Sequence, residues 1–209
     1  LQHSCFIAYL LYLRHMSKAT RNLIISAPHS NLRKTSKKVV NITPKILQII
    51  EDMKNATLDW EDNRQHELGV ALAAIQIDKP WRVIIVRENF EDKNNRNFLV
   101  LINPTITKLE GKIVKEYEGC LSVTDIYGSV PRYDKARIQA LDINGNKIKM
   151  KVEGFLSRVL QHEIDHLNGK LFIDHIKGNK NSLFKIDKNG QLIKADYDKE
   201  IKQSDIFRQ

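Results

Sequence analysis

The chain has 209 residues, 42% of them hydrophobic, with two cysteines and a formal net charge of +9. This length and apolar content fit one domain with extensions, and two cysteines exclude a disulfide framework. No apolar run approaches the roughly 18 residues of a membrane span, so we expect no membrane association of the mature protein.

The positive charge is concentrated at the start of the chain. Residues 1–50 contain eight of the 34 Lys and Arg residues and none of the 25 acidic residues, so the remaining chain is nearly neutral. That remainder carries no nucleic-acid-binding motif and no basic stripe interleaved with aromatic residues. We therefore expect no specific nucleic-acid partner.

The first 40 residues have the composition of a targeting leader. Residues 5–13 form a nine-residue apolar run, and the basic segment that follows contains Ser and Asn but no acid. This order resembles a signal peptide followed by a transit peptide, and an amphipathic start to the fold is the alternative. The abundance of Lys, Asn and Ile indicates an AT-rich genome. We therefore expect an organellar protein, with a plastid such as an apicoplast as the first choice and a mitochondrion as the second.

The remaining pattern predicts strands first and a helix after them. An amphipathic helix is expected at 44–62, with Thr43 as its cap and Pro44 at its first position. Strands are expected at 81–87, at 98–104 where Pro104 ends the run, at 112–117, and at 137–141 and 147–152 around an Asn-Gly turn. This order predicts an α+β fold and argues against a βαβ repeat.

The segment from Gln161 to His166, QHEIDH, is an HExxH motif. Flanking Leu, Val and Ile residues give it a helical apolar face, and Gly169 follows as a stop signal. His162 and His166 are four residues apart on one helix face, so both imidazoles can reach a single ion while Glu163 points nearby. A helix that carries these residues without a metal is the alternative, and the spacing favours the metal site.

The third ligand distinguishes the classes of HExxH protein. Metzincins place a histidine where this chain has Phe172, and another class uses a later glutamate, of which only Glu200 is available, in a polar tail. Upstream, Cys120 offers a thiolate, which together with two imidazoles leaves the fourth tetrahedral position open for water. A buried structural thiol is the other interpretation of Cys120.

Three ordered motifs resemble those of the peptide deformylases. That family carries GxGxAAxQ, EGCLS and HExDH, and here the chain reads GVALAAIQ at 69–76, EGCLS at 118–122 and HEIDH at 162–166. The resemblance spans about residues 45–177. It implies a catalytic domain at 41–177, after a leader at 1–40 and before a polar tail at 178–209, with antiparallel or mixed β-sheets around a central HExxH helix.

The resemblance implies removal of the N-formyl group from the formylmethionine of newly made organellar proteins, with release of formate. The metal ligands would be Cys120, His162 and His166. One divalent ion per chain would make water nucleophilic near neutral pH, and Glu163 would carry a proton from that water to the departing amine. This ligand set suits Zn²⁺, Fe²⁺, Ni²⁺ or Co²⁺, and the resemblance implies Fe²⁺ in the cell and Zn²⁺, Co²⁺ or Ni²⁺ in purified protein.

Further residues are assigned supporting roles. The resemblance gives the developing oxyanion two donors, the side-chain amide of Gln76 and the backbone N–H of Leu121. Asp165 points away from the two histidines, and we expect it to pair with Arg132 as a support for the ligands.

Substrate-binding residues are predicted beside the motifs. A formylmethionine site needs an apolar slot near the metal, for which Val70, Phe155 and Val159 are candidates, although each is equally suited to a core position. The resemblance suggests that Gly119 aligns the peptide backbone as an edge strand does. The expected partners are N-formylmethionyl peptides, as nascent chains at the ribosome exit, and we expect a monomer.

The chain departs from the family pattern at several positions. Ala71 stands where the first motif has its second glycine, and its methyl group would be strained if that backbone required positive φ. Thr124 replaces a usual proline, and Tyr127 stands where a basic residue is frequent. An HExxH peptidase and a weakly active metal-binding relative are therefore the alternative functions.

Overall fold

The computed structural model describes residues 19–202, except residue 65, together with residues 204, 206 and 207. Two α-helices and seven strands make up this described part, with short 3₁₀ and π-helical segments between them. None of its helices has the length and apolar character needed to span a membrane. The helices are α2 (Pro44–Asp62) and α3 (Gly154–Leu167), and the strands are β1 (Ala71–Ala73), β2 (Val83–Arg87), β3 (Phe98–Cys120), β4 (Val123–Leu141), β5 (Lys147–Glu153), β6 (Leu183–Ile186) and β7 (Leu192–Lys194).

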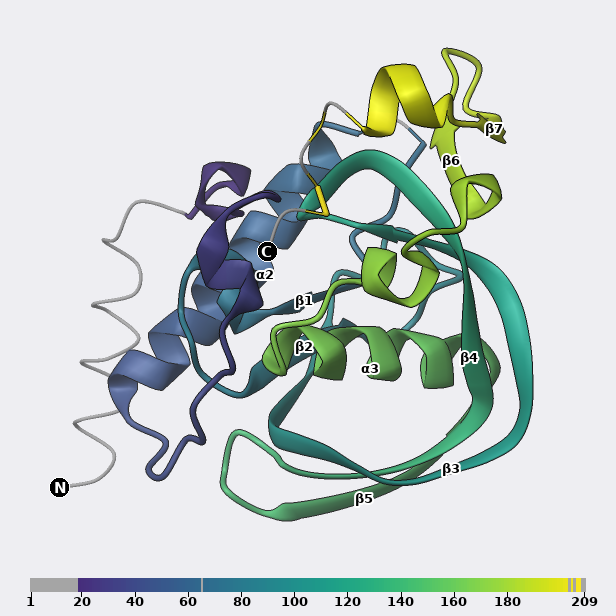
Figure 1. Ribbon diagram of the computed structural model, residues 1–209. Coiled ribbons are helices and arrows are strands. Elements are labelled where there is room, and N and C mark those ends of the chain that lie inside the picture. Colours follow the sequence, from purple (N-terminus) through teal and green to yellow (C-terminus); the bar gives the residue numbers. More distant parts are fainter. Residues whose placement is uncertain (1–18, 65, 203, 205, 208–209) are drawn as a thin grey trace, which may run out of the picture.

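The seven strands form one antiparallel sheet. The order is β1-β2-β3-β4-β6-β7, and β5 pairs with the part of β4 that β6 leaves free. The long strands β3 and β4 curve around α3, which lies inside the bend (Figure 1). The predicted α+β class with a central HExxH helix is therefore confirmed.

Helix α2 has the predicted bounds and packs through one apolar face. Ile46, Ile50 and Met53 recur at helical spacing and are at most 4% exposed, against the first two strands. Pro44 occupies the first helical turn, where its missing N–H costs nothing. Thr43 is the N-cap residue, as predicted, although its side chain makes no capping hydrogen bond.

The predicted end of a strand at Pro104 was wrong. β3 continues to Cys120, with a shift in register between Ile102 and Thr105 that accommodates the proline. Asn103 has φ +53° at this irregularity, and its side-chain amide makes two 2.8 Å hydrogen bonds with the backbone of Val39. A contact with a segment 64 residues earlier in the chain therefore stabilises the irregular backbone.

Parts of both predicted extensions pack onto the domain. Residues 1–18 of the expected leader lie outside the described residues, but Leu32 and Val39 are buried and Ile25 donates a backbone hydrogen bond to Gln76 at 2.8 Å. The packed domain thus begins before residue 41. At the other end, within the predicted polar tail, β6 and β7 form a hairpin, and a buried cluster includes Leu183 and other residues from both ends of the chain.

Candidate metal centre and catalytic cleft

Helix α3 carries the HExxH motif into the centre of the protein. Its first residue, Gly154, has φ +59°, and Gly169, just past its end, has φ +73°, a backbone conformation that favours glycine. A Cβ atom at Gly169 would lie 2.3 Å from the carbonyl oxygen of Arg33, so the chain near residue 33 closes against this end of α3. His162 and His166 are consequently 8% and 0% exposed.

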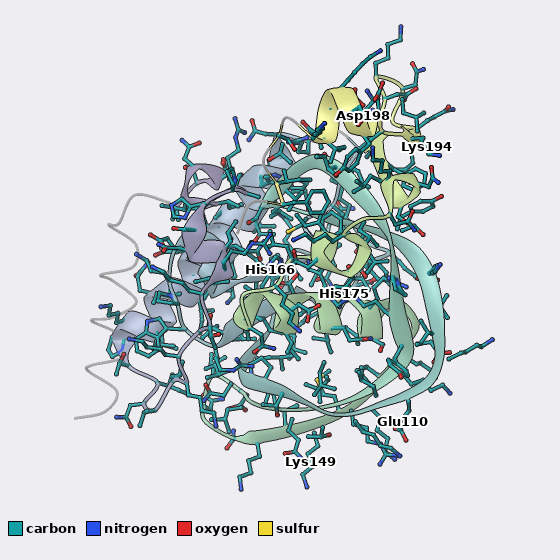
Figure 2. The ribbon with its side chains drawn as sticks, viewed as in Figure 1. Glu110, Lys149, His166, His175, Lys194 and Asp198 are labelled. Carbon is teal, nitrogen blue, oxygen red and sulfur yellow. The ribbon has the colours of Figure 1, made fainter. Side chains whose placement is uncertain are left out.

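The three predicted metal ligands lie together. Sγ of Cys120 is 3.3 Å from Nε2 of His166, and that nitrogen is 3.1 Å from Nε2 of His162. All three ligand atoms lie within 4.8 Å of one another. Figure 2 shows His166 in the interior of the molecule, whereas the labelled side chains Glu110, Lys149 and Lys194 lie at its periphery.

This donor set fits a divalent metal ion. A thiolate and two imidazole nitrogens direct lone pairs toward one buried point, where they repel one another unless a cation lies between them. Three protein ligands with an open fourth position are typical of catalytic metal sites. The donor types are compatible with Zn²⁺, Fe²⁺, Co²⁺ and Ni²⁺ and do not choose among them.

Glu118 supports the metal site, a role that the sequence analysis did not assign to it. Its Oε2 lies 2.9 Å from Nδ1 of His162, the nitrogen that faces away from the metal position. Arg132 and Arg158 donate hydrogen bonds of 2.9 and 2.7 Å to its Oε1, and all three side chains are at most 5% exposed. Burial opposes ionisation of Glu118, but bonds from His162 and Arg132 outweigh it and lower the pKa of its carboxyl. A carboxylate in this position orients the imidazole and raises its basicity as a ligand.

The predicted pairing of Asp165 with Arg132 is present. Asp165 also lies 2.7 Å from Nε2 of His175, so its carboxylate joins a guanidinium and an exposed imidazole. Burial alone would raise the pKa of Asp165, but the hydrogen bonds from His175 and Arg132 lower it. Because Arg132 also binds Glu118, Asp165 reaches the ligand His162 through two intervening side chains.

Glu163 lies beside the ligands and is available for proton transfer. Its carboxyl is 5% exposed, and its Oε2 has no hydrogen-bond partner in the described part of the chain. Burial raises the pKa of Glu163 to about 7. A carboxyl group with this pKa can both accept and release a proton near neutral pH.

Gln76 lies next to the ligand Cys120, as predicted. Its Oε1 accepts a 2.8 Å hydrogen bond from the backbone N–H of Ala73, which fixes the orientation of the amide. Its Nε2 therefore faces Ser122 Oγ at 3.1 Å and Cys120 Sγ at 3.5 Å. Leu121 follows Cys120 in the same wall. The amide of Gln76 can thus donate a hydrogen bond to an oxygen next to the metal position.

A cleft of about 320 Å³ opens above the metal ligands. Its lining includes every predicted substrate-binding residue, namely Val70, Ala71, Gly119, Phe155 and Val159. Phe155 is 48% exposed and packs edge-to-face against Phe90, with ring centroids 5.1 Å apart. An apolar side chain therefore has an apolar wall beside Glu163 and His162.

Ala71 does not strain the backbone. It is a residue of β1, pairs with Val86 and is not among the residues with positive φ. The strand conformation accepts a Cβ atom, so the conflict considered for this departure from the family motif does not arise. The methyl group of Ala71 instead forms part of the cleft lining.

Four polar residues of the outer cleft were not predicted as a group. Arg64 lies 3.1 Å from Glu67 and 2.6 Å from Asp125, and Tyr127 donates its hydroxyl to Glu67. Burial and this hydrogen bond raise the pKa of Tyr127. The contacts connect the loop after α2 to the start of β4. The sequence alone could not show them, because their members are up to 63 residues apart.

Comparison with known proteins gives consistent matches. A family model described as polypeptide deformylase matches residues 22–182. The peptide deformylase of Buchnera aphidicola subsp. Acyrthosiphon pisum (strain Tuc7) is 42% identical over 153 residues, which cover 73% of this chain and 82% of that protein. The peptide deformylase of Psychrobacter cryohalolentis is 41% identical, with 73% and 78% covered.

Solved structures show the same similarity. A Synechococcus elongatus peptide deformylase in complex with actinonin has a TM-score of 0.67 and 29% identity, covering 79% of this chain and 86% of that one. A Plasmodium falciparum peptide deformylase has a TM-score of 0.65 and 34% identity, covering 74% and 86%. The family match ends at residue 182, so β6 and β7 lie beyond it.

Proposed function

Because this chain belongs to the polypeptide deformylase family, we propose that it removes the formyl group from N-formylmethionyl peptides and releases formate. The observation that carries the proposal is the group of Cys120, His162 and His166 beside a buried Glu163 at the base of an open cleft. The cleft can receive the end of an extended peptide, and its apolar wall suits the methionine side chain.

The residues of the cleft have separate tasks in this reaction. Cys120, His162 and His166 would hold a divalent ion, which would supply the Lewis acidity needed for water to attack the formyl carbon near neutral pH. Glu163 accepts the proton of the attacking water and delivers it to the departing amine nitrogen. Burial raises the pKa of this carboxyl to about 7, so the group can both accept and release a proton near neutral pH. Glu118 and Arg132 hold His162 in place throughout.

The negative charge that develops on the formyl oxygen needs donors. The amide of Gln76 is oriented by Ala73 and lies against the wall that Cys120 and Leu121 form. We assign Gln76 and the backbone N–H of Leu121 to this oxygen. Donors that are fixed before the reaction stabilise such a charge without reorganising.

We also propose Val70, Ala71, Phe155 and Val159 as the slot for the methionine side chain, and Gly119 as the backbone that aligns the peptide. A side chain at Gly119 would collide with the ring of Tyr127, since a Cβ atom there would lie 2.6 Å from it. The absence of a side chain leaves this strand edge open to a peptide backbone.

Formate release from a formyl-Met-Ala-Ser peptide tests the proposal. The protein is purified without oxygen and loaded separately with Fe²⁺, Zn²⁺, Co²⁺ or Ni²⁺, and we propose that Fe²⁺ is the ion used in the cell. An unblocked Met-Ala-Ser peptide is the control, because an HExxH peptidase would cleave peptide bonds in either substrate. Absence of formate with every metal would contradict the proposal, and such a protein would be a metal-binding relative without this activity.

We further infer an organellar enzyme that acts on nascent chains, in a plastid-type compartment before a mitochondrion. The acid-free, basic composition of residues 1–50 supports this inference. Fusion of residues 1–40 to a fluorescent reporter tests it, and a reporter that stays outside both organelles would contradict it.

All residues in the roles above come from one chain, which is consistent with a monomer. Light scattering checks the mass.

A further inference from the structure

We infer that the hairpin of β6 and β7 is the outer wall of the peptide-binding cleft and that Ile186 contacts apolar residues of the substrate beyond formylmethionine. The inference rests on the proposed function, since it extends the same cleft to the peptide that follows the formyl group. Ile186 lines the cleft together with the metal ligands Cys120 and His162. The hairpin lies after residue 182, where the family match ends.

The sheet positions the hairpin at the cleft. β6 pairs with the start of β4 through Tyr127 with Phe184 and Gly128 with Leu183. The ring of Phe184 packs edge-to-face on Tyr117 of β3, with centroids 4.8 Å apart. Figure 1 shows β6 and β7 at the end of the sheet that lies opposite the β5 hairpin.

The tip of the hairpin meets the opposite wall. Gly190 lies in the turn between β6 and β7, and a Cβ atom placed there would be 3.3 Å from the His66 ring. His66 and Trp60 line the same cleft from the end of α2 and the loop that follows it. The hairpin therefore bridges from β4 to this loop and bounds the cleft on its outer side.

The outer part of the cleft combines paired polar side chains with apolar surface. Its charged side chains pair with one another, since Arg64 binds both Glu67 and Asp125 and Tyr127 donates to Glu67, and the two carboxylates leave this group with one net negative charge. The apolar surface here includes the side chain of Ile186 and the rings of Tyr127 and Trp60, and the guanidinium of Arg64 lies over the Trp60 ring at 5.2 Å from its centroid. An apolar side chain on the second or third residue after formylmethionine fits this wall better than an acidic one, which the carboxylates of Glu67 and Asp125 would repel.

The test compares three substrates that end in an amide, formyl-Met-Ala, formyl-Met-Ala-Leu-Leu and formyl-Met-Ala-Ser-Ser. The decisive quantity is the ratio of kcat/KM for the Leu-Leu peptide to kcat/KM for formyl-Met-Ala. We expect Ile186→Ala to lower this ratio on the order of tenfold, through KM, because it removes an apolar contact made only by the longer peptide. Formyl-Met-Ala is the reference substrate, because it lacks the residues that would contact Ile186.

A matched control exists in the same hairpin. Ile193 on β7 is 39% exposed and is not part of the cleft lining, so Ile193→Ala should leave the ratio unchanged. Ile186→Leu keeps an apolar side chain, so its ratio of kcat/KM values should stay close to that of the unaltered protein. An unchanged ratio in Ile186→Ala, or an equal fall in Ile193→Ala, would overturn the inference. Failure of the unaltered protein to hydrolyse formyl-Met-Ala with any metal would instead refute the proposed function.

Discussion

Oε2 of Glu118 lies 2.9 Å from Nδ1 of His162, while Nε2 of the same ring faces Cys120 and His166. One carboxylate therefore fixes the tautomer and the orientation of a metal ligand. The same carboxylate pairs with Arg132 and Arg158, so the metal centre and these buried ion pairs share one residue.

Replacement of Glu118 by glutamine should weaken metal binding. The amide keeps the shape but loses the charge that supports His162, and we expect the metal Kd to rise about 10-fold to 100-fold. Competition with a chromophoric chelator measures it. Glu116→Gln is the control, because Glu116 pairs with Arg158 at 3.1 Å but is 55% exposed in that pair. If the two variants bind metal equally well, the carboxylate does not tune the ligand.

Replacement of Glu163 by glutamine should separate metal binding from turnover. Oε2 of Glu163 has no hydrogen-bond partner among the described residues, so the fold and the metal affinity should persist. Loss of the proton shuttle should lower kcat about 10²-fold to 10⁴-fold. Metal content and formate release are measured on the same sample. A variant that retains turnover would assign proton transfer to another group.

Gln76→Ala should slow the reaction without lowering the affinity for the metal ion. It removes the donor oriented by Ala73, and loss of one such donor typically lowers kcat about 10²-fold to 10³-fold. Ser122→Ala is the matched variant, because it removes the 3.1 Å contact to Gln76 and leaves the amide in place. We expect a much smaller loss of kcat there. Equal losses would show that Gln76 acts by packing.

The sequence predicted the metal ligands better than their support. The i, i+4 spacing of His162 and His166 is a local property of a helix, and it led to Cys120 once the downstream ligands of other classes were missing. The contacts of Glu118 could not be predicted in this way. Its partners Arg132 and Arg158 lie 14 and 40 residues later in the chain, and only the curvature of β3 and β4 around α3 brings them together.

The fold shows the same division. Helix α2 and the turn around Asn144 and Gly145 follow from local pattern, and the structure has both. The passage of β3 through Pro104 depends instead on the side chain of Asn103, which bonds to Val39. The position of Ile186 in the cleft wall likewise depends on the pairing of β6 with β4. A local pattern in a polar segment does not predict such a long-range pairing.

Arg87→Met should destabilise the fold strongly. Arg87 and Glu61 form a buried ion pair with side chains 0% and 2% exposed, and Arg87 also binds the carbonyl of Gly69 at 3.2 Å. Removing the guanidinium leaves a buried carboxylate, so the free energy of unfolding should fall by about 3–5 kcal/mol. Urea denaturation measures it.

A neighbouring ion pair supplies the control. Arg96 pairs with Asp62, the residue after Glu61, but these side chains are 43% and 55% exposed. Arg96→Met should therefore change the free energy of unfolding by about 0–1 kcal/mol. Equal losses in Arg96→Met and Arg87→Met would show that burial does not govern these pairs.

Tyr127 should ionise only above the ordinary pKa of tyrosine, and its ionisation should weaken the protein. Burial and the hydrogen bond to Glu67 raise its pKa above the ordinary value of about 10. With a folded-state pKa above the unfolded one, its contribution to stability is complete below about pH 10 and is lost as the pH rises further toward the folded-state pKa. The difference in phenolate absorbance between the unaltered protein and Tyr127→Phe follows this group alone.

The stability of Tyr127→Phe completes the test. At pH 7 the variant lacks a hydrogen bond to a carboxylate and should unfold about 1–2 kcal/mol more easily. The difference in the free energy of unfolding between the two proteins should narrow above pH 10. In the unaltered protein, Tyr127 then ionises more readily in the unfolded state than in the folded state, which favours unfolding, whereas the phenylalanine of the variant cannot ionise. Denaturant unfolding at both pH values measures this. A gap that widens with pH, or a Tyr127 that titrates near pH 10, would show that the bond between Tyr127 and Glu67 does not hold the two cleft walls together.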